Sequence, residues 1–177
     1  MQRNRTLPAL LLTLATAFIP PAHAGDAPSA ADVAALKSFR LDQGFLDRFM
    51  ALQDDAVKDP CHLSMGNLLK GNQARSLDQA ARQYDAQPGV HAMLARHGLT
   101  ARQALIGMSA LLGAVMQDMK ETHPEMAQHM HSRGGAVSPQ NMAFYRAHKA
   151  QIQQHQQTLG HRQLAAHGGK LPSCMAR

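Results

Sequence analysis

The sequence predicts an all-α protein, a compact bundle of about five or six helices around one central apolar helix. Three observations predict this class. In several segments apolar residues recur at the three-and-four spacing of a helical face. Start and stop signals of helices frame those segments. No run of alternating apolar and polar residues has the length of a strand, and no unit repeats along the chain.

The central helix is expected over residues 100–122, the most apolar part of the chain after the N-terminus. Thr100 is placed to cap it, and His123-Pro124 marks its end. Its charge-free part spans only about 21 Å at 1.5 Å per residue, which is too short for a hydrocarbon layer of about 30 Å. We therefore expect a buried helix of a soluble domain. Its predicted core face consists of Leu105, Met108, Leu112, Val115 and Met119, widened by Ile106, Leu111 and Met116.

Further helices are expected on both sides of the central one. A first long helix would begin at Asp42 as N-cap and end before Asp59-Pro60. Two short helices would follow, one opened by the capping box of Ser76 and Gln79, the other by Pro88 and closed by Gly98. A long C-terminal helix is expected over residues 139–167. Its apolar seam is thin, so we expect its first half to pack and its second half to be solvated or covered by a partner.

The N-terminus has the three parts of a secretory signal peptide, which we assign to residues 1–24. Arg3 and Arg5 precede an apolar run from Leu7 to Ile19, and Ala22-His23-Ala24 supplies a small-x-small cleavage site. Residues 25–41 are expected to be a flexible or irregular lead, and residues 42–177 a single helical domain. The expected location is therefore the periplasm or the outside of the cell, with no transmembrane segment after cleavage.

Charge and composition argue against nucleic acid as a partner. The full chain carries 18 basic and 12 acidic residues, a net charge of +6 at pH 7, and the two signs are interleaved. Only 4% of the residues are aromatic and tryptophan is absent, which removes the usual stacking platforms for bases. The expected partner is a protein or another component of the cell envelope.

Two cysteines, Cys61 and Cys174, lie in a chain that the signal peptide would route to an oxidising compartment. A disulfide between them would close a loop of more than 100 residues, worth about 4 to 5 kcal/mol in the chain-entropy model. A nucleophilic Cys61 beside His62, or a pair of metal thiolates, are the competing interpretations. Neither cysteine lies in a CxxC pattern.

The sharpest chemical feature is a concentration of methionine and histidine over residues 116–131. Thioethers and imidazoles suit Cu(I), and imidazoles also suit Cu(II) and Zn(II), so a copper or zinc site is an alternative function. Against it, Met119 continues the predicted core stripe, and His123 and His129 lie on opposite sides of Pro124. Beyond this alternative we expect no cofactor. The candidate ligands are Met119, His123, Met126, His129, Met130 and His131.

Signatures of enzymes are not found. His123-Pro124-Glu125 followed by His129 lacks the spacing of HExxH. Gly107-Met108-Ser109 lacks the last glycine of a nucleophile elbow and lies in an expected helix. We therefore expect a non-catalytic binding or structural module that acts in the periplasm, with copper or zinc binding as the alternative.

Three segments resemble a family of small exported all-helical proteins of Gram-negative bacteria that carry no assigned activity. They are LDQAARQYDAQPGV (77–90), LARHGLTARQALI (94–106) and SPQNMAFYRAH (138–148). The resemblance covers about a third of the chain. It implies export and a helical fold, and it implies no catalytic residue.

Overall fold

The computed structural model describes residues 29–58, 76–123, 125, 137–166 and 168. Within these residues the protein has six helices and no strand, so the all-α prediction is confirmed. The predicted signal peptide and both cysteines lie outside the described residues. The helices are α1 (Ala30–Ser38), α2 (Gln43–Lys58), α4 (Leu77–Asp85), α5 (Pro88–Arg96), α6 (Ala101–Thr122) and α8 (Pro139–Ala166).

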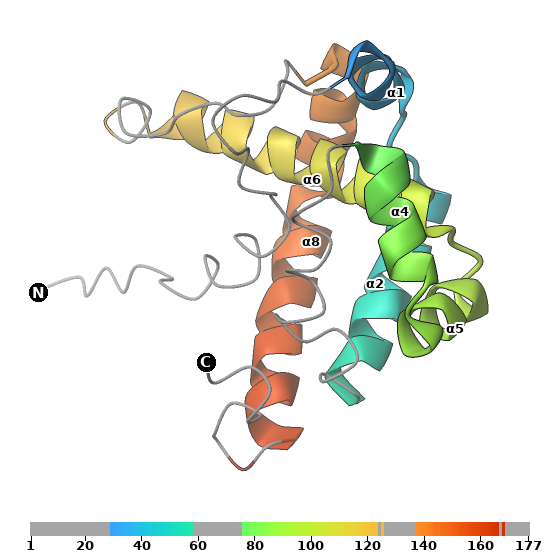
Figure 1. Ribbon diagram of the computed structural model, residues 1–177. Helices are drawn as coiled ribbons and strands as arrows, with labels where there is room; N and C mark the ends of the chain where they lie inside the picture. Colours follow the sequence, from blue (N-terminus) through green and yellow to red (C-terminus); the bar gives the residue numbers. More distant parts are fainter. Residues whose placement is uncertain (1–28, 59–75, 124, 126–136, 167, 169–177) are drawn as a thin grey trace, which may run out of the picture.

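The two long helices α6 and α8 cross each other, and the shorter helices are grouped around them (Figure 1). α4 and α5 pack on the first half of α6, and α2 packs along α8. The end of α6 reaches past α8 on the side away from α4 and α5 (Figure 1). No single helix of the described residues is long and apolar enough to span a membrane, whereas α5 and α6 together pass that test but are bent by 74°.

Local capping signals determine where most helices begin and end, as predicted. Asp42 accepts a hydrogen bond from the Phe45 N–H at 2.6 Å, and Ser76 accepts one from Gln79 at 3.1 Å. Thr100 and Gln103 form a full capping box at the start of α6. Gly98 ends the preceding turn in the left-handed region, with φ of 62°. Part of the expected irregular lead is helical, because α1 forms behind its own cap, Ser29.

The buried face of α6 differs from the predicted one. Leu105, Met108 and Val115 are only partly buried at the edge of the core, and the buried stripe is turned by about 100°, one residue along the helix. Small side chains dominate the buried stripe, which lets neighbouring helices approach closely. A Cβ on Gly107 would lie 2.1 Å from the Phe45 ring, so the ring occupies the space that glycine leaves. The buried residues of α6 are Ala101, Ala104, Ile106, Gly107, Ala110, Leu111, Ala114 and Asp118.

The core is built around phenylalanines, and the buried polar residue Asn141 connects it to the backbone between α1 and α2. Phe45 is 3% exposed, stacks on Phe49 at 5.5 Å between ring centroids and meets Phe39 edge-on at 5.4 Å. Asn141 of α8 is 2% exposed; its side chain accepts a hydrogen bond from the Leu41 N–H and donates one to the Phe39 carbonyl. Asn141 thus satisfies the backbone between α1 and α2 where that backbone is buried.

The second half of α8 packs on α2 along its thin apolar seam. Ile152 and Leu159, two residues of this seam, are buried. Gln156 donates a hydrogen bond to Gln53 at 3.2 Å, and Arg162 pairs with Asp54 of α2 at 3.0 Å. The other side chains after Ile152 in α8 are exposed or partly buried, which agrees with the expectation that this half is largely solvated or covered by a partner.

Candidate functional site on the outer half of α6

The last three turns of α6 carry a row of side chains that point away from the buried stripe. We call the row formed by Leu112, Met116, Met119 and His123 the outer stripe. Its apolar members are partly buried and His123 is exposed. None of the four belongs to the hydrophobic core cluster or to the side chains that pack on that cluster. Met119 was predicted to continue the core stripe, and the structure contradicts that prediction.

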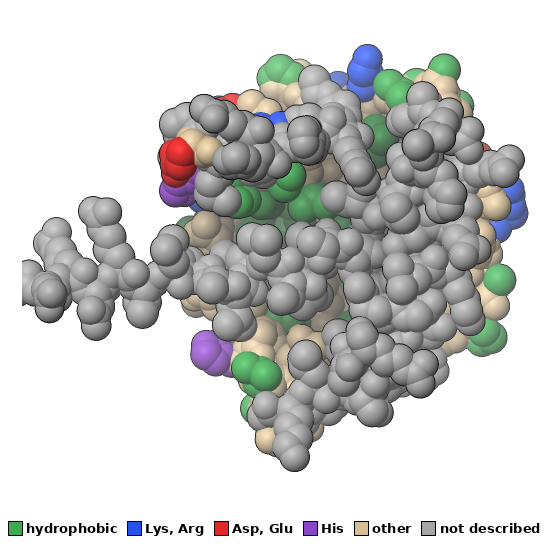
Figure 2. Space-filling view, turned by 60° about the vertical axis from the view of Figure 1, so that its left-hand side comes forward, with side chains coloured by type: hydrophobic (Ala, Val, Ile, Leu, Met, Phe, Trp, Pro, Cys, Tyr) green, Lys and Arg blue, Asp and Glu red, His purple; other side chains and the backbone are tan. Residues whose placement is uncertain are grey.

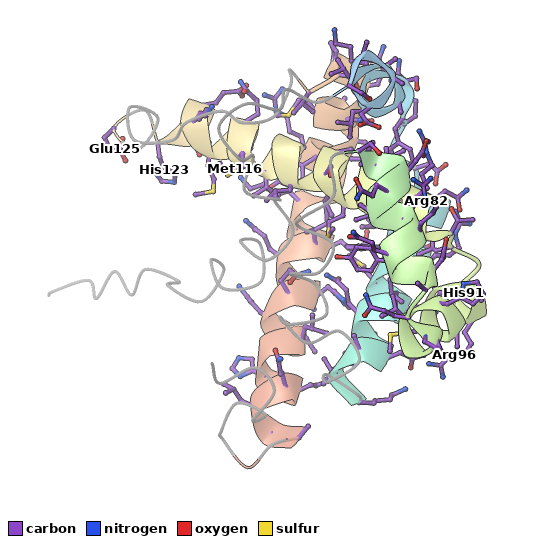
Figure 3. All side chains as sticks on the ribbon, in the orientation of Figure 1. Arg82, His91, Arg96, Met116, His123 and Glu125 are labelled. Carbon is purple, nitrogen blue, oxygen red and sulfur yellow. The ribbon has the colours of Figure 1, made fainter. Side chains whose placement is uncertain are left out.

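Figure 3 shows how the outer stripe is presented. Met116 and His123 point to the same side of α6, near its free end, and Glu125 lies just beyond them. In Figure 2, hydrophobic side chains of the described residues reach the surface on this face of the molecule, close to histidine and acidic side chains. The end of α6 therefore brings partly buried thioether side chains and an exposed imidazole to one side of the helix.

The backbone and one carboxylate fix the position of His123. Its N–H donates a hydrogen bond to the Met119 carbonyl at 2.8 Å, and with φ of −134° and ψ of 71° it is the C-cap residue at which α6 ends. Its Nδ1 lies 3.4 Å from Glu125 Oε1, and the two side chains are 54% and 70% exposed. Because Nδ1 faces this carboxylate, Nε2 is the ring nitrogen left for a ligand.

The opposite side of the same turns holds α6 on α8. Asp118 is 8% exposed and pairs with Lys149 at 2.6 Å, which raises the pKa of Lys149. Glu121 accepts a hydrogen bond from Gln117 at 3.0 Å and pairs with Arg146. The Gln117 hydrogen bond, together with the charge of Arg146, lowers the pKa of Glu121. These contacts anchor the last turns of α6 on α8.

A second polar cluster joins the end of α2 to the end of α5. Asp55 accepts hydrogen bonds from Lys58 at 2.8 Å and from His97 Nε2 at 2.9 Å. These bonds, that of Lys58 first, lower the pKa of Asp55 to about 2. Asp55 and His97 are 42 positions apart, so no sequence pattern connects them. The cluster links α2 to the end of α5.

The histidines of α8 have local structural roles. The His148 ring stacks on Phe144 at 4.1 Å between centroids, and its Nδ1–H donates a hydrogen bond to the Phe144 carbonyl. Burial lowers the pKa of His155, whose Nε2 is buried. Both side chains are partly buried.

The structure covers only part of the predicted metal site. Met119 and His123 are described, whereas Met126, His129, Met130 and His131 lie outside the described residues, as do the disulfide candidates Cys61 and Cys174. Met116 was not among the candidate ligands chosen from the sequence, although its spacing of three and seven residues from Met119 and His123 puts it on their side of α6. In the part of the chain that the structure describes, no three His, Cys, Asp or Glu side chains come together as a metal-ligand group.

Comparison with protein-family models, with curated proteins and with solved structures gives no match to this chain. The function is therefore inferred from the residues themselves.

Proposed function

We propose that the protein is an exported helical module that acts by binding and not by catalysis, with the outer stripe as its binding surface. Export is supported by residues 1–24, with their basic start, apolar run and cleavage site. The same leader supports a location in the periplasm or outside the cell. The resemblance to small exported helical proteins agrees with both.

The observation that carries the proposal is the position of Met116 and Met119 on α6. Both are partly accessible and lie outside the core cluster, although a stripe of this kind would be expected to pack. Methionine is flexible and polarizable, and it is often used on surfaces that bind other molecules. Apolar side chains that form a row at the surface mark binding sites more often than scattered ones do.

The ionisable groups support a role without catalysis. A catalytic acid or base combines a shifted pKa with a position that a substrate can reach. Here the shifted carboxylates are engaged in ion pairs, Asp55 with His97 and Lys58, and Glu121 with Arg146. Burial raises the pKa of Tyr84 to about 12. These groups hold helices together.

An anionic partner is less well supported than a ligand of the outer stripe. Several basic side chains are already paired with acids of the same chain, namely Arg102 with Asp78 at 2.7 Å and Arg162 with Asp54 at 3.0 Å. Lys149 and Arg146 are paired on α8 in the same way. These four pairs neutralise part of the positive charge that a single-sign surface would need.

Oxidation footprinting in cells tests the proposal whatever the ligand is. Intact cells and the purified protein would be treated with dilute peroxide, and the sulfoxide at each methionine measured by mass spectrometry. We expect Met116 and Met119 to be oxidised more slowly in cells than in the purified protein. Met50, which packs on the core from the edge, should be oxidised at the same rate in both samples.

Equal oxidation of Met116 and Met119 in cells and in the purified protein would contradict the binding surface. Cell fractionation tests export separately. A full-length chain in the cytoplasm, with residues 1–24 intact, would contradict it.

A further inference from the structure

We infer that the end of α6 is a Cu(I) site, in which the thioethers of Met116 and Met119 and the imidazole of His123 bind one ion. The inference rests on the proposed function, because it names the ligand of the outer stripe. It uses only residues that the structure describes.

The helical spacing puts the three donors within reach of one ion. Met116 and Met119 are three residues apart and share one side of α6. His123 follows four residues later as the C-cap residue of the helix. An ion at the level of Met119 would be about 4.5 Å along the axis from Met116 and about 6 Å from His123, at 1.5 Å per residue. Methionine has three rotatable side-chain bonds and can span this offset. Figure 3 shows Met116 and His123 on the same side of the helix.

The type of donor selects the metal. Thioether sulfur is a soft ligand that favours Cu(I), whereas Zn(II) is usually held by thiolates, imidazoles and carboxylates. Two of the three donors here are thioethers. Since the described residues bring no three His, Cys, Asp or Glu side chains together, they offer Zn(II) no complete set of its usual ligands.

Two further features of the site favour a bound cation. Glu125 Oε1 lies 3.4 Å from His123 Nδ1, the position of a carboxylate that orients a metal-binding imidazole. The site also lies at the C-terminal end of a 22-residue helix. The carbonyls of the last helical turn carry partial negative charge, which stabilises cations.

The hydrophobic core of the described residues does not include these methionines. Met93 and Met142 are 3% and 7% exposed in the core, and Met108 packs on the core from its edge. Met116 and Met119 are partly buried and belong neither to this core nor to the described side chains that pack on it. The described core therefore separates the methionines into a group that fills space and a pair that lies outside it.

Titration of the mature, untagged protein with Cu(I) in competition with bicinchoninate, without oxygen, tests the inference. We expect one Cu(I) to bind with a dissociation constant below micromolar. The triple variant Met116→Leu, Met119→Leu, His123→Asn should lose this binding, since leucine keeps the volume and removes the sulfur. Glu125→Gln should weaken it by about tenfold, as the loss of an orienting carboxylate does.

Matched control variants address the other methionines and histidines. Met108→Leu on the same helix and His161→Asn, an exposed histidine of α8, should bind Cu(I) as the wild type does. Substitution of Met126, His129, Met130 and His131 together should leave the one-ion binding in place. A circular dichroism spectrum like that of the wild type would show that the triple variant is folded.

Three results would overturn the inference: no Cu(I) binding tighter than micromolar, unchanged binding by the folded triple variant, or tighter binding of Zn(II) than of Cu(I). The failure of the Cu(I) site is distinguishable from that of the proposed function. If Met116 and Met119 stay protected from oxidation in cells depleted of copper, the outer stripe is a binding surface for a different ligand, such as a protein.

Discussion

The two sides of α6 carry side chains of different size and differ in how closely they pack. The buried stripe uses small side chains such as Ala104, Gly107 and Ala114, and it brings α6 close to its neighbours. The outer stripe uses Leu112, Met116 and Met119, which are larger and more apolar, and leaves them partly accessible. The difference teaches that the most hydrophobic face of a helix need not be the face that packs, because close approach selects for small side chains.

The largest loss of stability is expected from Phe45→Ala, which removes the ring that packs on the buried stripe of α6. Phe45 is 3% exposed and fills the space opposite Gly107, so its loss leaves a cavity between α2 and α6. We expect the free energy of unfolding to fall by about 3 to 5 kcal/mol, measured by denaturant titration. A loss below about 1 kcal/mol would mean that this contact does not hold α6.

A smaller loss of stability is expected when Gly107 is replaced by alanine. In Gly107→Ala the added carbon would lie 2.1 Å from Phe45 Cζ, so the ring must move. Overpacking of this kind costs about 1 to 3 kcal/mol, although alanine is the better helix former.

Gly44→Ala in α2 provides the control for helix propensity. The nearest atom to its added carbon is Asp42 Oδ1 at 3.4 Å, an ordinary contact. This variant should gain up to about 1 kcal/mol. A gain in both variants would contradict the close approach of α6 and α2.

The pH dependence of stability should report on the side of α6 that is anchored to α8, and not on the outer stripe. The Gln117 hydrogen bond and the Arg146 charge lower the pKa of Glu121 below its ordinary value of 4.5. The stabilisation is therefore fully present above that value and is lost as the pH falls through the lowered pKa. Unfolding measured in steps between neutral and acidic pH should show a shallower acid loss in Glu121→Gln than in the wild type. An identical pH profile would show that Glu121 does not stabilise the fold.

The start and end of every long helix could be predicted from the sequence because they depend on neighbouring residues. Asp42, Thr100 and Ser138 cap helices within three positions of themselves, and Gly98 ends a turn. The choice of the buried face of α6 could not be predicted in this way. It depends on Phe45, 62 positions before Gly107 and on another helix, and such distant contacts leave no periodic signal.

The candidate site was predictable by residue type and not by environment. Methionine and histidine mark residues 116–131 as unusual, and Met119 and His123 were chosen for that reason. Their periodicity also agreed with a core stripe, so the sequence could not separate a ligand from a packing residue. Only the orientation of α6 against α2, α4 and α8 does so.

The most direct test of the account is the stability of the double variant Met116→Gln, Met119→Gln beside that of Met93→Gln. Glutamine forms helices as well as methionine does and is polar, so it reports whether the side chain is needed in the core. We predict that the double variant keeps the free energy of unfolding within about 1 kcal/mol of the wild type. Met93→Gln, at a position that is 3% exposed, should lose about 3 kcal/mol or more. A comparable loss in both proteins would contradict the account, because it would place the outer stripe in the core.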